Sequence, residues 1–386
     1  MDFIVLSDDW GRHPSSSQHL FRRLAREHRT LWVETIGLRP PRLRWADGRR
    51  MVEKLGRMFA PSVGLAERAP WCETPPLLRR NAPPMHPFYG SRFGAGLNDA
   101  LLRPLVRRAA SRAGLERPVL LTTVPNAAGL VGHLGESCAI YYCVDDFETW
   151  PGYAADAIRS LEARLVASVD GLVVTADALA ERRGRPGLPC LSLPHGVDGA
   201  LFAAGGPRPE PLENAGHPLL MSLGLYDERI DVPLLGAVLD ANPAWHLAFV
   251  GPRTAAPNAL DTHPRVQVHP GVAYTEVPAW LHAADCLLIP YVRNGQTDAI
   301  NPLKLREFLA TGRPVATTAL PEVVRSYGAL VPTGDGPDGY SGAIARALSL
   351  PNAAAADRQG AVAADDWHAR AAQLLDFIER VRATRG

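Results

Sequence analysis

The chain has 386 residues, 46% of them hydrophobic and 21% charged, and this length exceeds the size at which one hydrophobic core stops growing, so two domains are expected. The net charge is only +1, with 26 basic and 21 acidic residues up to residue 200 and 15 and 19 after it, which argues against a nucleic-acid-binding protein. Five scattered cysteines without a CxxC pair indicate neither a disulfide framework nor a zinc site and fit a reducing cytoplasm.

The first half of the chain alternates short apolar runs with stretches of helical period, which is typical of parallel βαβ units. The strand FIVLSDD, the helix QHLFRRLAREH and the strand TLWVETI come first. The strands VLLTTVP, AIYYCVDDF, GLVVTA and CLSLPHG follow, with helices expected over about 153–168 and from Asp177. This pattern predicts one doubly wound, Rossmann-like domain over residues 1–200.

The second half repeats the pattern after a Gly- and Pro-rich stretch, which predicts a linker over residues 201–218. The strands LLMSLGL, HLAFVGP, VQVHPGV, CLLIPYV and PVATTAL then alternate with helices. They predict a second doubly wound domain over 219–360. A last amphipathic helix within 361–386 is expected to pack back on the first domain. The predicted fold class is therefore α/β, with two Rossmann-like domains facing a cleft.

Residues 38–100 fit neither pattern. They are rich in Pro and Arg, and four apolar residues could form one side of a basic helix: Trp45, Met51, Leu55 and Met58. Such a helix can lie on an anionic membrane surface. The alternative is an ordinary solvated insertion, which we favour. No leader pattern and no apolar run near 18 residues occurs, so the expected location is the cytoplasm, with peripheral contact at the inner membrane face left open.

Lysine is rare in this sequence, which has 39 arginines and only two lysines, Lys54 and Lys304. Asn301 and Pro302 predict a helix start, with an N-cap amide and a proline at the first helical position, and Lys304 as the third helical residue. An ammonium group at a helix N-terminus suits a diphosphate. Glu307, one turn further, suits ribose hydroxyls. The alternative, held equally open, is a surface ion pair between Lys304 and Glu307.

The segment NPLKLREFLATGRPVATTALPEV resembles the donor-binding segment of GT-B glycosyltransferases, especially the bacterial family 4-like enzymes that build cell-surface polysaccharides. The stretches YYCVDDF, LEARLVASVDGLVVTADALAE and LPHGVDGALF are similar to other parts of the same family. The resemblance implies a sugar nucleotide in the cleft, without any other cofactor. It does not separate a UDP-linked from a GDP-linked donor.

The resemblance also implies roles for individual donor-site residues. Lys304 and Arg229 would neutralise the diphosphate, and Glu307 would bond the ribose. The remaining donor-binding positions that it implies are Gly271 and Val272, whose backbone would read the base edge, and the helix start at Asn301, Pro302 and Leu303.

Three features depart from the family pattern. The first of two family acids is replaced by Ala299, and the nearest acid is Asp298. The family histidine after the VLLTTVP strand is missing, with Pro125 and Asn126 in its place. His195 is interpreted as structural rather than catalytic.

The third departure is the loop after the first strand, where the family has a Gly-rich loop and this chain has DDWGRHPSSSQ. His13, Ser15 and Ser16 are candidates to donate hydrogen bonds to phosphate or acceptor. Ser17 is equally well interpreted as the N-cap of the following helix.

The mechanism implied by the resemblance is retaining. Cationic side chains can stabilise the leaving diphosphate, and no Asp-x-Asp metal motif is evident, so no metal is expected. Asp145 and Asp146 are candidates to orient the acceptor hydroxyl or act as base, against the alternative that they cap a turn. The expected acceptor is a glycan or a lipid-linked sugar, and no nucleic acid is expected as partner.

Two other functions stay open at this point. The chain could be an inactive sugar-nucleotide-binding partner of another transferase, or a sugar-nucleotide epimerase. A nicotinamide oxidoreductase is disfavoured because no strand is followed by GxGxxG.

Overall fold

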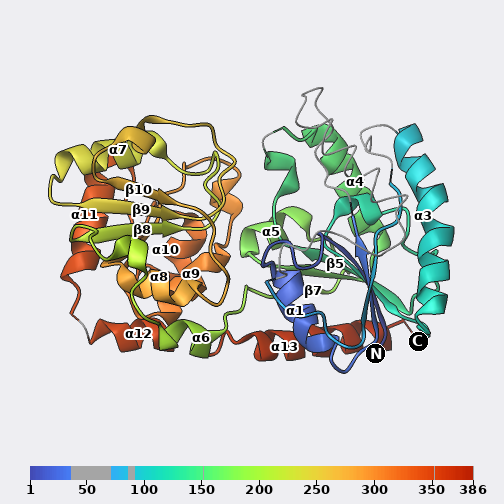
Figure 1. Ribbon diagram of the computed structural model, residues 1–386. Helices are drawn as coiled ribbons and strands as arrows, with labels where there is room; N and C mark the ends of the chain where they lie inside the picture. The colour runs from blue at the N-terminus through green and yellow to red at the C-terminus, as the bar shows by residue number, and fades with distance from the viewer. Residues whose placement is uncertain (36–70, 86–91, 151, 352, 386) are drawn as a thin grey trace. The chain divides into compact units, whose positions relative to one another are not determined.

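The computed structural model describes residues 1–35, 71–85, 92–150, 152–351 and 353–385 (Figure 1). The chain divides into two compact units: unit 1 comprises Met1–Pro194 and Arg370–Gly386, and unit 2 comprises His195–Ala369. The basic helix expected around Trp45, Met51, Leu55 and Met58 lies outside the described residues. No helix within these ranges is long and apolar enough to span a bilayer.

Unit 1 is built on one parallel sheet of seven strands, in the order β3-β2-β1-β4-β5-β6-β7 (Figure 1). Its central strands are apolar and buried along their whole length, as expected for a sheet covered on both faces. The strand order reverses between β1 and β4. The strands are β1 (Phe3–Ser7), β2 (Thr30–Glu34), β3 (Leu78–Asn81), β4 (Val119–Thr122), β5 (Cys138–Cys143), β6 (Gly171–Val174) and β7 (Cys190–Ser192).

The helices of unit 1 connect these strands and cover the sheet. Helix α1 begins at Ser16 after Ser15, so the prediction of Ser17 as an N-cap is wrong: Ser17 is buried inside the helix. The helices of this unit are α1 (Ser16–Leu24), α3 (Arg92–Arg112), η1 (Pro125–Ala127), η2 (Phe147–Thr149), α4 (Ala155–Ser168) and α5 (Asp177–Arg183).

Unit 2 has a five-stranded parallel sheet in the order β10-β9-β8-β11-β12, which reverses between β8 and β11. Both sheets are thus doubly wound, which confirms the predicted α/β class with two Rossmann-like domains. The strands are β8 (Leu219–Leu223), β9 (His246–Val250), β10 (Val266–His269), β11 (Cys286–Ile289) and β12 (Val315–Thr317). The helices are α6 (Gly199–Ala204), η3 (Glu210–Leu212), α7 (Val232–Ala241), η4 (Ala259–Thr262), α8 (Val277–Ala283), η5 (Thr297–Ala299), α9 (Leu303–Ala310), α10 (Pro321–Tyr327), α11 (Gly336–Ser349) and α12 (Ala354–Gly360).

The boundaries between the units differ from those expected from sequence. The stretch 201–218 is part of unit 2 rather than a free linker, because Phe202 is fully buried there. Its ring packs edge-on against Tyr274 with centroids 5.7 Å apart, and its carbonyl accepts a hydrogen bond from His282 Nε2 at 2.8 Å. An apolar anchor inside a Gly- and Pro-rich stretch therefore fixes it to the domain that follows.

The C-terminal helix α13 (Trp367–Ala383) does not form a separate segment over 361–386. Its first residues belong to unit 2, where the ring of Trp367 lies against Gly196. From Arg370 onward the helix belongs to unit 1, where Phe377 packs against Gly171 at the start of β6 and Arg385 pairs with Asp170 at 3.1 Å.

Candidate functional site

The topology of unit 2 indicates where a ligand binds. In open parallel sheets, ligands lie beyond the carboxyl ends of the strands, at the point where the strand order reverses. Here that point lies between β8, which ends at Leu223, and β11, which ends at Ile289. Gly224 directly follows the end of β8, and Tyr291 follows the end of β11 after one residue, Pro290.

Two cationic side chains meet at this point, above a single aromatic ring. Lys304 Nζ lies 5.1 Å from the centroid of the Tyr291 ring, and Arg229 Cζ lies 5.4 Å from it. Both distances are within the range of a cation–π contact. The structure thus brings together the two residues that the sequence assigned to a diphosphate.

Glycine is favoured at position 224 by the backbone conformation, and Lys304 lies beside it. Gly224 has a φ of +124°, and a Cβ placed on it would lie 3.0 Å from Lys304 Nζ. Gly251, at the end of β9 with a φ of +152°, approaches the Gly224 carbonyl so closely that a Cβ there would lie 1.9 Å from the oxygen. The loops after β8 and β9 therefore leave space only for backbone beside the lysine.

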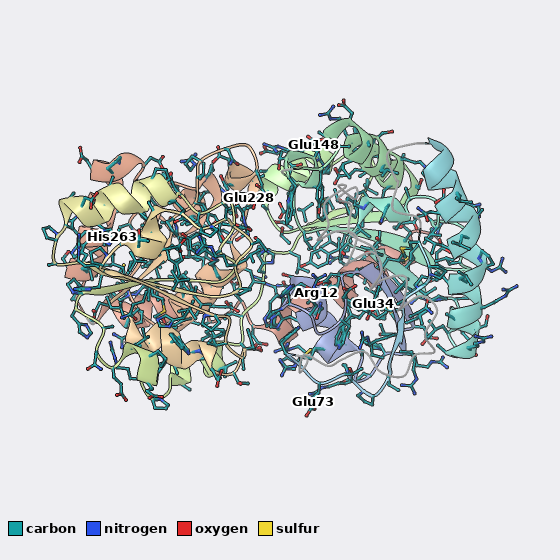
Figure 2. All side chains as sticks on the ribbon, turned by 45° about the horizontal axis from the view of Figure 1, so that its top comes forward. Arg12, Glu34, Glu73, Glu148, Glu228 and His263 are labelled. Carbon is teal, nitrogen blue, oxygen red and sulfur yellow. The ribbon has the colours of Figure 1, made fainter. Side chains whose placement is uncertain are left out.

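Arg229 lies on the loop between β8 and α7, which Figure 2 marks by the label of its neighbour Glu228. Asp227 holds the guanidinium, with Nη2 2.8 Å from Oδ2 and Nε 3.0 Å from Oδ1. The loop ends where Asp231 caps α7 by accepting the Leu234 amide at 3.0 Å. A short turn bounded by a cap therefore fixes the arginine near the strand end.

Helix α9 starts differently from the sequence prediction. It begins at Leu303 with Pro302 as N-cap, so Lys304 is the second helical residue rather than the third. Asn301 does not cap the helix, because its buried side-chain oxygen accepts a hydrogen bond from Arg306 Nη1 at 2.7 Å. Arg306 is held in turn by Asp365 at 2.9 Å. Through Arg306, Asn301 is linked to Asp365, and this contact fixes the segment that leads into α9.

Glu307 is buried on the same helix, with 7% of its surface exposed, so the alternative of a surface ion pair with Lys304 is wrong. No ion pair between the two side chains is found, although the structure describes both. Burial raises the pKa of Glu307 to about 8, against the lowering effects of the Tyr274 hydroxyl, 3.4 Å away, and of the Lys304 charge. A buried carboxyl group with a raised pKa can lose its proton when a ligand arrives and then accept hydrogen bonds from that ligand.

The other predicted donor-site residues lie on neighbouring loops. Gly271 and Val272 follow β10, and Gly271 is close to Pro252, to whose Cδ a Cβ would be 3.1 Å. Their readout of a base stays a prediction. Ala299 is buried in η5, while Asp298 pairs with Arg293 at 2.7 Å. The nearest acid is thus already neutralised by an arginine.

In unit 1, Asp146 is fully buried and forms ion pairs with both Arg182 and Arg183, the latter at 2.6 Å. Arg183 also contacts Glu148, labelled in Figure 2, at 3.7 Å. Asp145 Oδ1 accepts the Asp146 amide at 2.8 Å. Two guanidinium groups on one carboxylate favour a structural role for Asp146 over the predicted base, whereas the role of Asp145 stays a prediction.

A polar cluster lies where the strand order of unit 1 reverses, after β1 and β4. Asp8 accepts hydrogen bonds from Ser7 Oγ at 2.9 Å, Gln18 Nε2 at 2.8 Å and Ser15 Oγ at 3.4 Å. Thr123 Oγ1 bonds Ser7 Oγ at 2.9 Å. Burial raises the pKa of Asp8 to about 6. Sequence analysis missed Asp8, although an acid directly after the first strand of a doubly wound domain could have indicated it.

The remaining residues of the predicted phosphate loop are not brought together. His13 is exposed on the turn before α1, and Ser16 is buried in the first turn of the helix. Ser15 reaches the Asp8 cluster, and so does Ser17, whose Oγ lies 3.0 Å from Ser7 Oγ and 3.1 Å from Ser15 Oγ. Within the described ranges, no group of three or more His, Cys, Asp or Glu side chains could hold a metal ion, and metal independence stays a prediction.

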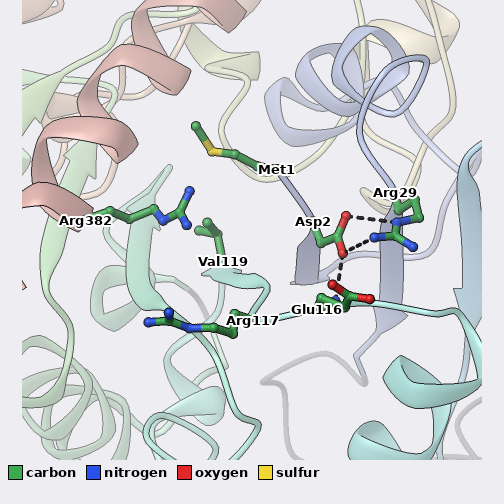
Figure 3. Close-up of a pocket in the computed structure, with 7 residues that line it drawn as sticks. All are labelled: Met1, Asp2, Arg29, Glu116, Arg117, Val119 and Arg382. Carbon is green, nitrogen blue, oxygen red and sulfur yellow. Dashed lines mark hydrogen bonds and ion pairs between the residues drawn. The ribbon is translucent and has the colours of Figure 1, made fainter. Parts of the chain in front are cut away.

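A cavity of about 230 Å³ lies at the opposite, amino-terminal edge of the unit 1 sheet (Figure 3). There Asp2 is bonded to Arg29 at 2.9 Å and to the Glu116 amide at 2.8 Å. The wall also includes Val119, the first residue of β4. Since open parallel sheets bind ligands at their carboxyl ends, this cavity is not the candidate site.

Comparison with known proteins agrees with the geometry of unit 2. Residues 232–349 match the family model described as Glycosyl transferases group 1. Over 178 residues the chain is 28% identical to "Putative teichuronic acid biosynthesis glycosyltransferase TuaH" of Bacillus subtilis (strain 168). That match covers 42% of this chain and 44% of TuaH, so it spans less than half the length of this curated relative.

Solved structures extend the similarity of fold over nearly the whole chain. Sucrose-phosphate synthase from Thermosynechococcus elongatus has a TM-score of 0.72 at 14% identity, covering 99% of both chains. HepE from Anabaena, in complex with UDP and glucose, has a TM-score of 0.68 at 13% identity, covering 98% of this chain and all of HepE. The chain therefore has the GT-B fold, and residues 232–349 of its second unit match the glycosyl transferases group 1 model.

Proposed function

We propose that this protein is a glycosyltransferase that moves a sugar from a nucleotide diphosphate sugar to a glycan or lipid-linked acceptor. The observation that carries the proposal is the convergence of Lys304 and Arg229 on one ring at the strand-order reversal of unit 2. Lys304 also lies inside the region that matches the family model. Two fixed cations at this place form a site for two phosphate groups.

The proposed chemistry follows from the charges at the site. Cleavage of the sugar–phosphate bond leaves negative charge on the diphosphate, and preorganised cations stabilise it. Lys304, Arg229 and the N-terminus of α9 supply this stabilisation without a metal. Glu307 accepts hydrogen bonds from the ribose. We propose a retaining outcome, in line with the family that the donor segment resembles.

The relatives suggest the substrate class. HepE has been solved in complex with UDP and with UDP-glucose, which favours a uridine donor. The name of TuaH refers to teichuronic acid biosynthesis, which favours a growing polysaccharide as acceptor. A cytoplasmic location belongs to the same proposal.

Calorimetric titration with UDP and GDP, each with and without magnesium, tests the donor site. We expect one nucleotide to bind irrespective of magnesium, and to lose its affinity in Lys304→Ala. The matched control is Arg325→Ala, which removes an exposed cation paired with Glu322 on α10. If neither UDP nor GDP binds, the proposal is contradicted.

A second assay separates transfer from the competing functions. The protein is incubated with UDP-glucose, with and without a polysaccharide or lipid-linked acceptor extract, and released UDP and the sugar are both quantified. Acceptor-dependent UDP release indicates a transferase. A changed sugar without an acceptor indicates an epimerase, and binding without turnover indicates an inactive partner.

A further inference from the structure

We propose that Tyr291 is a positioning residue of the diphosphate site, whose ring face holds Lys304 and Arg229 in place before a nucleotide arrives. This inference rests on the proposed function, because it states how the same site recognises a diphosphate. It assigns a role to a side chain that the sequence did not single out.

The geometry around the ring is that of two cations within cation–π distance of the same aromatic ring. Lys304 comes from α9 and Arg229 from the loop before α7, and they lie 5.1 and 5.4 Å from the ring centroid. The face of an aromatic ring carries partial negative charge, which attracts cations within about 6 Å. Two cations gathered around one ring repel each other, so their attraction to the ring offsets part of the cost of placing both there.

Tyr291 is itself firmly held. It is 3% exposed, and its carbonyl accepts a hydrogen bond from Thr318 Oγ1 at 2.8 Å. It pairs with Ile230 in an isolated antiparallel bridge, and the Val292 amide donates to the Arg229 carbonyl at 2.8 Å. The segment that carries the ring is therefore tied to the loop that carries the arginine.

The two cations depend on the ring to different degrees. Arg229 also has the Asp227 carboxylate, whereas Lys304 has no ion pair with any residue that the structure describes. A lysine side chain is flexible and loses several rotamers when it is fixed. Because the Tyr291 ring and the Gly224 backbone are its neighbours, removing the ring should leave the ammonium group poorly placed for a phosphate.

The experiment compares a nucleoside diphosphate with its monophosphate. Dissociation constants of UDP and UMP are measured by calorimetry for the wild type, Tyr291→Phe, Tyr291→Leu and Tyr291→Met. UMP keeps the base, the ribose and one phosphate, so the ratio of the two constants isolates the second phosphate. If the wild type binds GDP instead, GDP and GMP take their places.

We expect Tyr291→Phe to stay within about threefold of the wild type for both nucleotides, because the ring face is kept. Tyr291→Leu and Tyr291→Met should weaken UDP about tenfold, the scale of one or two cation–π contacts, and UMP far less. Trp71→Leu is the matched control, since it removes a ring 5.8 Å from Arg22 Cζ in unit 1. The ratio of the UDP and UMP dissociation constants of this variant should equal that of the wild type.

Three results would overturn the inference while leaving the proposed function intact. They are unchanged UDP affinity in the Leu and Met variants, equal losses for UDP and UMP, and a Phe variant as weak as the Leu variant. The second would mean that Tyr291 supports only the general fold, and the third that its hydroxyl matters instead of its ring. A wild type that binds no nucleotide would refute both proposals.

Discussion

Replacing Glu307 by Gln should remove a pH dependence of folding stability that the wild type carries between about pH 4.5 and 8. In the folded protein burial raises the pKa of Glu307 to about 8, whereas the ordinary value is 4.5. The folded state therefore binds a proton that the unfolded chain has lost. Stability from this group is fully present below pH 4.5 and is lost as the pH rises toward 8.

The structure sets the size of this effect. The difference between 4.5 and about 8 corresponds to about 5 kcal/mol of free energy of unfolding at 1.36 kcal/mol for each pKa unit. Water and the Lys304 charge can relax toward the ionised carboxylate, so we expect on the order of 2–5 kcal/mol. Glutamine has the same shape, stays neutral and can still accept from the Tyr274 hydroxyl.

Urea unfolding of both proteins at pH 5, 6, 7 and 8 measures the difference. Near pH 5 the two free energies of unfolding should agree closely, and by pH 8 the Gln variant should be the more stable. Contributions from other titrating groups cancel in the comparison. The exposed Glu276 provides the control, since Glu276→Gln should follow the wild type at every pH. Parallel curves for wild type and Glu307→Gln would refute the buried, protonated carboxyl.

Three further changes test other parts of the structure. Lys304→Ala should lower kcat by about 10²–10³, the scale of one lost charge donor, in the UDP-release assay, and normal turnover would remove Lys304 from the site. Asp146→Asn should cost about 2 kcal/mol in urea unfolding, because Arg182 and Arg183 lose their shared partner while Arg183 keeps Glu162 at 2.7 Å, and a change under 1 kcal/mol would argue against a structural pair. In the wild type, the free energy of unfolding should fall by about 2 kcal/mol as the pH rises from about 4 to 6, since the Asp8 pKa is raised to about 6. Asp8→Asn should abolish this fall. The same urea series measures it, and an unchanged pH slope would contradict it.

The sheets could be predicted from sequence because their strands are buried on both faces. Runs such as residues 3–6 and Cys286–Ile289 are apolar without interruption, which leaves few alternatives for a chain of alternating βα pattern. Lys304 was found for a similar reason: a rare residue type at a recognisable helix start. In both cases the residues of the segment itself are enough for the prediction.

Features that depend on distant partners could not be predicted. Asn301 was expected to cap α9, but its side chain bonds Arg306, which is held by Asp365, 59 residues further along the chain. Asp146 was a candidate to orient the acceptor hydroxyl or act as base, but its two arginines lie 36 and 37 residues further along the chain. Phe202 lies in a stretch of linker composition and is nevertheless buried against Tyr274. A single sequence does not show such contacts, because nothing in the local pattern specifies the partner.

Because lysine is rare in this chain, Lys304 can be modified selectively. Reagents that acylate amines would find only Lys54, Lys304 and a chain terminus to modify, while the 39 arginines would stay untouched. Because the Lys304 ammonium group lies over a ring in a partly covered site, its rate of acylation would report directly on whether that site is filled. Mass spectrometry of one peptide could therefore follow occupancy in a crude extract, without a label and without knowledge of the acceptor.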